Sequence, residues 1–135
     1  MQSITLADAY TIESLRSKNY TNADIIETVK EGSTADFKSV NKNMDYSVLD
    51  ALHTSGDLET VLNDGYQVKF ITENGLKNLI KMKYGKEDGL DYLYDNNQVT
   101  GLQLDEEAQQ DLKNMLSQNW VFKAEENGVS ITPAK

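Results

Sequence analysis

Apolar residues recur with helical spacing over the first part of the chain. Thr5 and Thr21 each stand three residues before an aspartate, an arrangement typical of a capped helix N-terminus. The apolar stripes that follow them predict helices over about Leu6–Lys18 and Ala23–Glu31. A third stripe predicts a short helix over about Asp45–Thr54, after which the pattern changes.

The next segment has the alternation of a β-strand. Tyr66, Val68 and Phe70 are separated by single polar residues, which is the period of a half-buried strand. Asp64-Gly65 precedes this run, and an Asp-Gly pair between two short apolar runs is a strong signal for a tight turn. We therefore predict a β-hairpin over about residues 58–72, followed by another helix.

The last third of the chain repeats the order of a helix followed by a hairpin. An amphipathic stripe follows Asp105, and alternating apolar residues flank the turn signal Glu126-Asn127-Gly128. These features predict a helix plus a second β-hairpin over about residues 105–132. Before them, the spacing of Leu90, Leu93 and Tyr94 suggests a short helix.

Separate helices and hairpins place the chain in the α+β class. The 135 residues, of which 39% are hydrophobic, suffice for one compact domain or two small ones. We expect a helix-rich part over residues 1–85 and an acidic helix–hairpin part over residues 86–135, either separate or packed on the first as one domain. The similar order of elements in the two helix–hairpin stretches leaves internal duplication and chance as alternatives.

The segment Val48–Ile80 resembles the back half of a winged-helix domain. It has the pattern of a final core helix, two strands around a Gly-tipped wing, and a Thr-x-x-Gly-Leu helix start. With the two earlier helices, the resemblance extends over about residues 5–83. It implies a winged-helix-like N-terminal part, and in DNA-binding relatives the helix before the wing enters the major groove.

The charge distribution speaks against DNA binding through that helix. The chain has 13 basic and 22 acidic residues and a net charge of −9, so its overall field repels phosphate. The helix over about Asp45–Thr54 contains no Arg or Lys, and the wing tip is Asn63-Asp64. Neither offers the bidentate arginine contact that reads guanine.

A basic stretch over Tyr66–Lys86, with five lysines and one glutamate, nevertheless interrupts the acidic sequence. Three readings of it stay open: a solvated helix face, an internal contact with the acidic residues from Glu87 to Asp111, or a contact with phosphate or an acidic partner. If the protein binds nucleic acid, we expect the contacts to come from Lys69, Lys77, Lys81 and Lys83.

The residue types that carry most enzyme chemistry are scarce. There is no Cys, and His53 is the single His, with no evident carboxylate or nucleophile partner. We find no phosphate-binding glycine loop, nucleophile elbow or zinc motif. We therefore expect a protein that is not an enzyme, without a cofactor or a metal site.

The N-terminus, MQSITLADAY, lacks the basic and apolar regions of a signal peptide, and the apolar runs are too short to cross a bilayer. We therefore expect a cytoplasmic protein that does not enter membranes.

Tyrosines and aspartates gather in one short acidic segment. Alternate neighbours within Asp91–Asp95 cannot all point inward along one helix, so we expect at least one aromatic side chain to be exposed. Aromatics surrounded by carboxylates suit a protein interface. We therefore predict a partner-binding site formed by Asp88, Asp91, Tyr92, Tyr94 and Asp95.

The leading hypothesis is a non-catalytic interaction module that binds a protein partner, for which the acidic segment favours a basic one. It could act as an inhibitor, adaptor or regulator, including one that mimics nucleic acid through its acidic C-terminal part. A phage or mobile-element origin fits such a protein. The alternatives are a DNA-binding winged-helix transcription regulator and a structural or assembly component of a larger particle.

Overall fold

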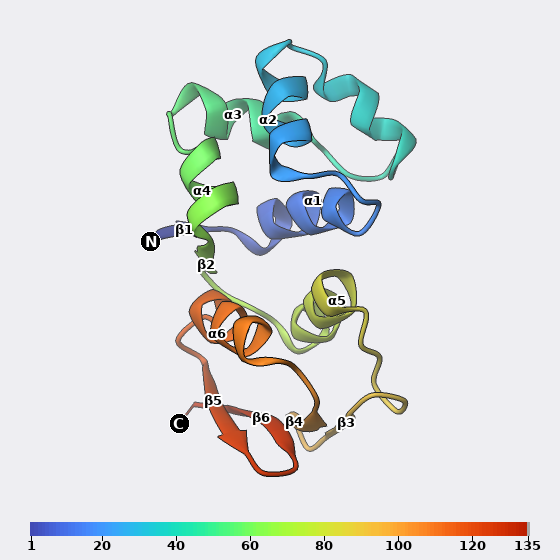
Figure 1. Ribbon diagram of the computed structural model, residues 1–135, viewed down its shortest axis with the longest axis vertical. Helices are drawn as coiled ribbons and strands as arrows, with labels where there is room; N and C mark the ends of the chain where they lie inside the picture. The colour runs from blue at the N-terminus through green and yellow to red at the C-terminus, as the bar shows by residue number, and fades with distance from the viewer. Residues whose placement is uncertain (135) are drawn as a thin grey trace.

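Helices dominate the first half of the computed structural model, which describes residues 1–134 (Figure 1). A short strand opens the chain and precedes this helical half. The elements are β1 (Gln2–Ile4), α1 (Leu6–Arg16), α2 (Asn22–Lys30), the 3₁₀ helix η1 (Thr34–Ser39), α3 (Ser47–Thr54) and α4 (Leu58–Asp64).

The predicted caps explain where the first two helices begin. The side chain of Thr5 accepts a hydrogen bond from the backbone N–H of Asp8 at the start of α1. Thr21 and Asp24 form a reciprocal capping box at the start of α2, each side chain accepting from the other's backbone. The predictions of helices in these two places are confirmed.

The predicted β-hairpin over residues 58–72 is wrong. Leu58, Val61 and Leu62 are buried on one face of α4, which packs against α2 and α3. Gly65 follows α4 with φ of 91°, so the Asp-Gly signal marks a helix end here and not a hairpin turn.

The residues after α4 pair with the start of the chain instead. The short strand β2 (Tyr66–Val68) runs parallel to β1, with Tyr66 opposite Gln2 and Val68 opposite Ile4. The backbone N–H of Lys69 extends this pairing by donating to the carbonyl of Ile4 over 2.8 Å. The wing that carried much of the winged-helix resemblance is therefore not formed by these residues.

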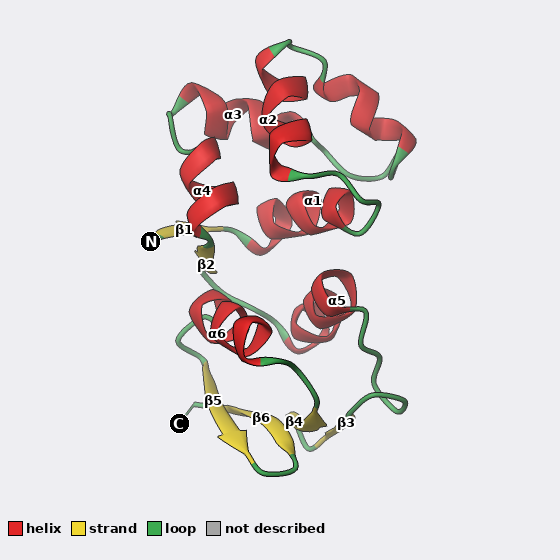
Figure 2. Ribbon diagram, viewed as in Figure 1, coloured by secondary structure: helices red, strands yellow, loops and turns green. Residues whose placement is uncertain are grey.

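The second half of the chain combines two helices with an antiparallel sheet (Figure 2). The strand order in this sheet is β3-β4-β6-β5. The elements are α5 (Glu73–Tyr84), β3 (Leu93–Asp95), β4 (Gln98–Leu102), α6 (Glu106–Met115), β5 (Trp120–Glu125) and β6 (Gly128–Pro133).

The structure confirms the helix plus hairpin over residues 105–132 and the α+β class. The short helix suggested by Leu90, Leu93 and Tyr94 is wrong, because this segment ends in β3. Asn96 and Asn97, with φ of 53° and 61°, form the two-residue turn between β3 and β4. The two stretches that read alike in the sequence thus fold differently, one as α3, α4 and β2 and the other as α6 and a hairpin.

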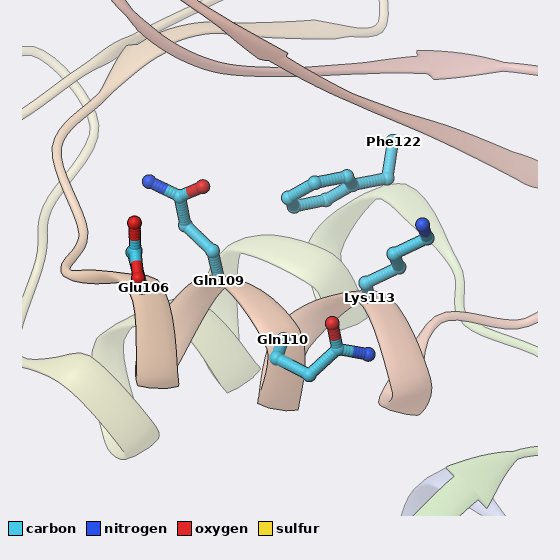
Figure 3. Close-up of a pocket in the computed structure, with 5 residues that line it drawn as sticks. All are labelled: Glu106, Gln109, Gln110, Lys113 and Phe122. Carbon is cyan, nitrogen blue, oxygen red and sulfur yellow. The ribbon is translucent and has the colours of Figure 1, made fainter.

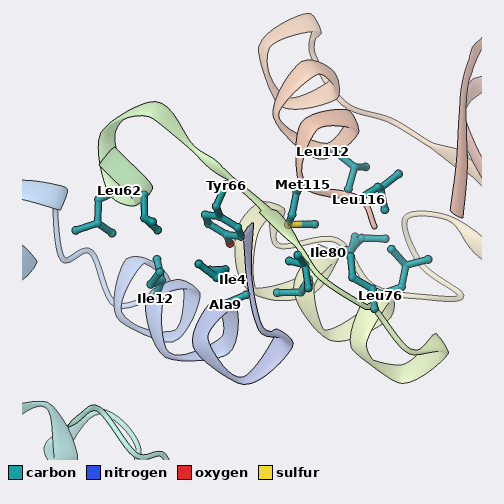
Figure 4. Packing of buried hydrophobic residues seen from close by; sticks show 14 of the residues in the cluster. Ile4, Ala9, Ile12, Leu62, Tyr66, Leu76, Ile80, Leu112, Met115 and Leu116 are labelled. Atoms are coloured by element: carbon teal, nitrogen blue, oxygen red, sulfur yellow. The ribbon is translucent and has the colours of Figure 1, made fainter. Parts of the chain in front are cut away.

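The buried apolar side chains of both halves form one continuous cluster. Figure 4 shows it around β2, where Ile4 and Tyr66 lie between α1 and the α5–α6 pair. In Figure 1, α5 and α6 form a layer between the N-terminal helices and the four-stranded sheet. Within residues 1–134, none of the helices has both the length and the apolar character that crossing a membrane requires.

A carboxylate sits inside the contact between the two halves. Glu13 of α1 is only 1% exposed. Its Oε2 atom accepts hydrogen bonds from Tyr66 Oη at 2.5 Å, from Arg16 Nη1 at 3.0 Å and from Lys83 Nζ at 3.2 Å. A buried carboxylate is stable only with such partners, because burial alone strongly disfavours its charged form.

The same network continues into α6. The Lys83 side chain is 6% exposed, and its Nζ atom also forms an ion pair with Asp111 at 3.0 Å. Tyr84 Oη donates to the same carboxylate over 2.6 Å. Glu13, Lys83 and Asp111 therefore join α1, α5 and α6 through charge-assisted hydrogen bonds.

We expect Lys83→Met to lower the free energy of unfolding by about 3 kcal/mol, because it leaves two carboxylates short of a buried partner. Lys81→Met on the same helix is the matched control. Lys81 pairs with Glu87 but its side chain is 65% exposed, so this change should cost less than about 1 kcal/mol. Urea unfolding of both variants checks the prediction, and equal losses would contradict it.

Candidate functional site

The residues between α5 and the β3–β4 turn expose apolar side chains among carboxylates. We call residues 86–95 the acidic loop. Leu90 is 80% exposed and Leu93 is 65% exposed. Large apolar side chains this accessible, next to exposed Asp91 and Asp95, are the features that distinguish this surface.

Backbone hydrogen bonds within the acidic loop fix its shape. Asp91 Oδ2 accepts from the backbone N–H of Glu87 at 2.8 Å, and Gly89 donates its backbone N–H to the carbonyl of Tyr92 at 2.8 Å. Asp88 Oδ1 accepts from the backbone N–H of Tyr94 at 2.9 Å. Two of the predicted site carboxylates therefore also hold the loop together.

The tyrosines of the predicted site lie differently from the expectation. Tyr92 is buried, and Tyr94 is half-buried. In the strand β3, Tyr94 stands opposite Val99, whose side chain is in the core, while Leu93 stands opposite the exposed Thr100. The exposed apolar residues of the site are thus leucines, and the expectation of an exposed aromatic side chain is wrong.

The Lys77 side chain covers Tyr94. Its Nζ atom lies 4.7 Å from the centre of the ring, which is the geometry of a cation–π contact. This contact ties the acidic loop to α5. Lys77, from the basic set predicted from the sequence, therefore contacts a residue of the predicted acidic site.

A hollow of about 230 Å³ separates α5 from the acidic loop. Lys81 Nζ forms an ion pair with Glu87 across it at 3.0 Å. The lining residues are Lys77, Asn78, Lys81, Lys86, Glu87, Asp88 and Tyr92.

The four lysines predicted as nucleic-acid contacts do not form one surface. Lys69 is exposed after β2, and Lys83 is buried against Glu13 and Asp111. The interpretation of the basic stretch as an internal partner of the acidic segment is confirmed for Lys81 and Lys83 by their ion pairs.

Strand alternation is the signal that could have identified the exposed side chain of Leu93. Asn96-Asn97 is a turn pair that tolerates positive φ, and it places β3 immediately before it. Leu93 and Asp95 then share one face of the strand, and Tyr94 takes the other. The exposure of Leu90, which lies in an irregular segment, had no such signal.

The other side chains that could support catalysis or bind a metal ion do not gather at the acidic loop. His53 is exposed near the end of α3. Within residues 1–134, no three His, Asp or Glu side chains lie close enough together to hold a metal ion. Compared with protein-family models, with curated proteins and with solved structures, the chain gives no match.

Burial and the nearby charges of Asp88 and Asp91 raise the pKa of Tyr92 to about 12. The ordinary pKa of tyrosine is about 10, so the unfolded chain loses this proton first as the pH rises. The free energy of unfolding should therefore fall between about pH 10 and 12.

We expect Tyr92→Phe to have a shallower fall over that pH range, because it removes one of the groups that titrate there. Urea unfolding at several alkaline pH values measures both slopes. The pKa values of Tyr66 and Tyr84 are also raised by burial and by their carboxylate partners, so part of the fall should persist in the variant. Identical slopes for the two proteins would contradict the assignment to Tyr92.

Proposed function

We propose that this protein is a non-catalytic interaction module whose acidic loop binds a basic segment of a partner protein. The observation that carries the proposal is the exposure of Leu90 and Leu93 among the carboxylates of Asp88, Asp91 and Asp95. Such a surface suits a partner segment that presents apolar side chains together with Lys or Arg. An inhibitor, an adaptor or a regulator could use it in this way.

The two kinds of side chain would contribute differently to binding. Removing Leu90 and Leu93 from water favours the complex in proportion to the apolar area covered. The carboxylates would steer a basic partner and accelerate its association, an effect that salt weakens. The affinity should therefore depend mainly on the leucines, and the association rate mainly on the aspartates.

The shape of the acidic loop supports this proposal. Its backbone is held by Asp88 and Asp91, and its tyrosines are anchored in the core or under Lys77. A surface that is already ordered loses less conformational entropy when a partner binds.

The alternative of a DNA-binding winged-helix regulator has weaker support. No hairpin wing is formed by residues 58–72, and Lys81 and Lys83 are paired with carboxylates. Lys77 lies over the Tyr94 ring. A phosphate would have to compete with these partners.

We expect the tagged protein to capture a partner from extracts of its own cells in a complex that survives nuclease treatment. Leu90→Ser combined with Leu93→Ser should weaken capture about tenfold or more, because both apolar contacts are lost. Phe70→Ser is the matched control, since Phe70 is 61% exposed elsewhere. Capture that the double variant leaves unchanged would contradict the proposal.

The role of the aspartates in association is tested by a separate measurement. Asp91→Asn with Asp95→Asn should slow association with the captured partner and reduce the dependence of that rate on salt. The amide oxygen introduced by Asp91→Asn can still accept the hydrogen bond from the Glu87 backbone, so the fold should be retained. An unchanged rate would show that the aspartates do not steer the partner.

Nuclease treatment distinguishes binding to a protein partner from binding to DNA. Loss of the complex on treatment would favour the DNA-binding alternative. In that case Lys77→Glu with Lys81→Glu should abolish a salt-sensitive mobility shift, because these residues carry the accessible positive charge of α5.

A further inference from the structure

The two edge strands of the four-stranded sheet differ in whether other residues cover their outward backbone groups. At the β3 edge, the acidic loop folds against the strand: Asp88 accepts from the backbone N–H of Tyr94, and Gly89 donates to the carbonyl of Tyr92. A covered edge cannot pair with another strand. The opposite edge, formed by β5, has no such cover among residues 1–134.

The register of β5 shows which backbone groups are free. Ala134 donates its backbone N–H to the carbonyl of Asn119 over 2.9 Å, so these two residues form a hydrogen-bonded pair of the ladder. Alternation along an antiparallel ladder then directs the N–H and C=O groups of every second residue away from β6. On β5 these residues are Trp120, Phe122 and Ala124.

Only one of these outward groups has a partner of its own. The backbone N–H of Trp120 donates to the carbonyl of Ser117 at 3.2 Å. Within the part of the chain that the structure describes, no further hydrogen bond reaches the outward N–H and C=O groups of Phe122 and Ala124. Two consecutive outward positions are thus available to another strand.

A groove runs beside this free edge. One stripe of α6 faces it with residues spaced by three and four, and Phe122 points toward that stripe (Figure 3). The space between them has a volume of about 370 Å³. The lining residues are Glu106, Gln109, Gln110, Lys113 and Phe122.

We propose that the occupant of this edge is a second copy of the same chain. The two β5 strands would run antiparallel about a two-fold axis at Phe122, which would join the two sheets into one. This arrangement gives the outward groups of Phe122 their counterparts in the second copy, and the backbone N–H of Ala124 would donate to the carbonyl of Trp120 of the second copy.

Charge complementarity favours a second copy over an unrelated peptide. Because α6 carries a carboxylate at one end of the stripe and an ammonium group at the other, the two-fold axis brings Glu106 of each copy toward Lys113 of the other. The glutamines Gln109 and Gln110 lie in the middle, where they meet no like charge. One residue pair thereby acts twice across the interface.

The charges on the other face of β5 disfavour a shift of the axis by one residue. An axis at Lys123 would place the two Lys123 side chains directly opposite each other, which is unfavourable. An axis at Phe122 places Lys123 beside Val121 of the second copy, whose side chain is 38% exposed in one chain. The aliphatic part of the lysine can cover that valine.

Sedimentation equilibrium of the full chain over a range of concentrations tests the proposal. We expect a reversible dimer, and Lys113→Glu should raise its dissociation constant about tenfold because two attractive pairs become repulsive. Combining it with Glu106→Lys should restore dimerisation, because the exchanged charges again meet across the axis. Lys18→Glu makes the same change of charge at an exposed position away from β5 and should have no effect.

A backbone variant tests the strand pairing itself. Ala124→Pro removes an N–H that points away from β6, so it should abolish the dimer while urea unfolding still reports a folded chain. A wild-type chain that stays monomeric at every concentration would overturn the proposal, as would a double charge variant that does not recover. The proposal would also be overturned if the amides of Phe122 and Ala124 were protected from hydrogen exchange only after an extended peptide is added. That result would assign the edge to a partner strand. None of these outcomes bears on the acidic loop, which lies at the other edge of the sheet.

Discussion

The buried carboxylate of Glu13 is the constraint on which the arrangement of the two halves depends. It lies in α1, yet its hydrogen-bond donors come from α1, β2 and α5, and Lys83 extends the network to Asp111 in α6. If α5 moved away from α1, the buried carboxylate of Glu13 would lose a cation in a place that water does not reach. Hydrophobic contacts favour many arrangements of helices, whereas this network is satisfied by one.

The acidic loop shows how one segment can serve stability and recognition together. Tyr92 is buried, Asp88 accepts from the β3 backbone, and Asp91 accepts from the backbone of Glu87, so these residues order the loop. Its outward groups, Leu90 and Leu93, are left in water. The β5 edge has the opposite character, because its side chains are packed or solvated while part of its backbone is free. The two proposed interactions thus use different physical forces and different edges of one sheet.

Local signals predicted the elements that local interactions form. The caps at Thr5 and Thr21 and the turn at Glu126–Gly128 act within a few residues, so the first two helices and the second hairpin could be predicted. The first hairpin could not, because Asp64-Gly65 serves equally well as a hairpin turn and as a helix end. What decided between them was the burial of Val61 against neighbouring helices and the pairing of β2 with a strand at the start of the chain.

Part of the candidate site could likewise be predicted from the sequence, and part depended on the tertiary structure. The sequence by itself determined that the segment from Asp88 to Asp95 is acidic and that a basic row precedes it on a helix. Helical spacing places Lys83 on the face of Leu76 and Ile80 and Lys81 on another face, but it does not show which distant carboxylates either lysine meets. The tertiary structure placed Lys81 on the surface beside Glu87 and Lys83 in the interior between Glu13 and Asp111. Residue type determines which partners a charge requires, but only the packing of distant segments determines whether that charge stays in water or must be neutralised by carboxylates from distant parts of the chain.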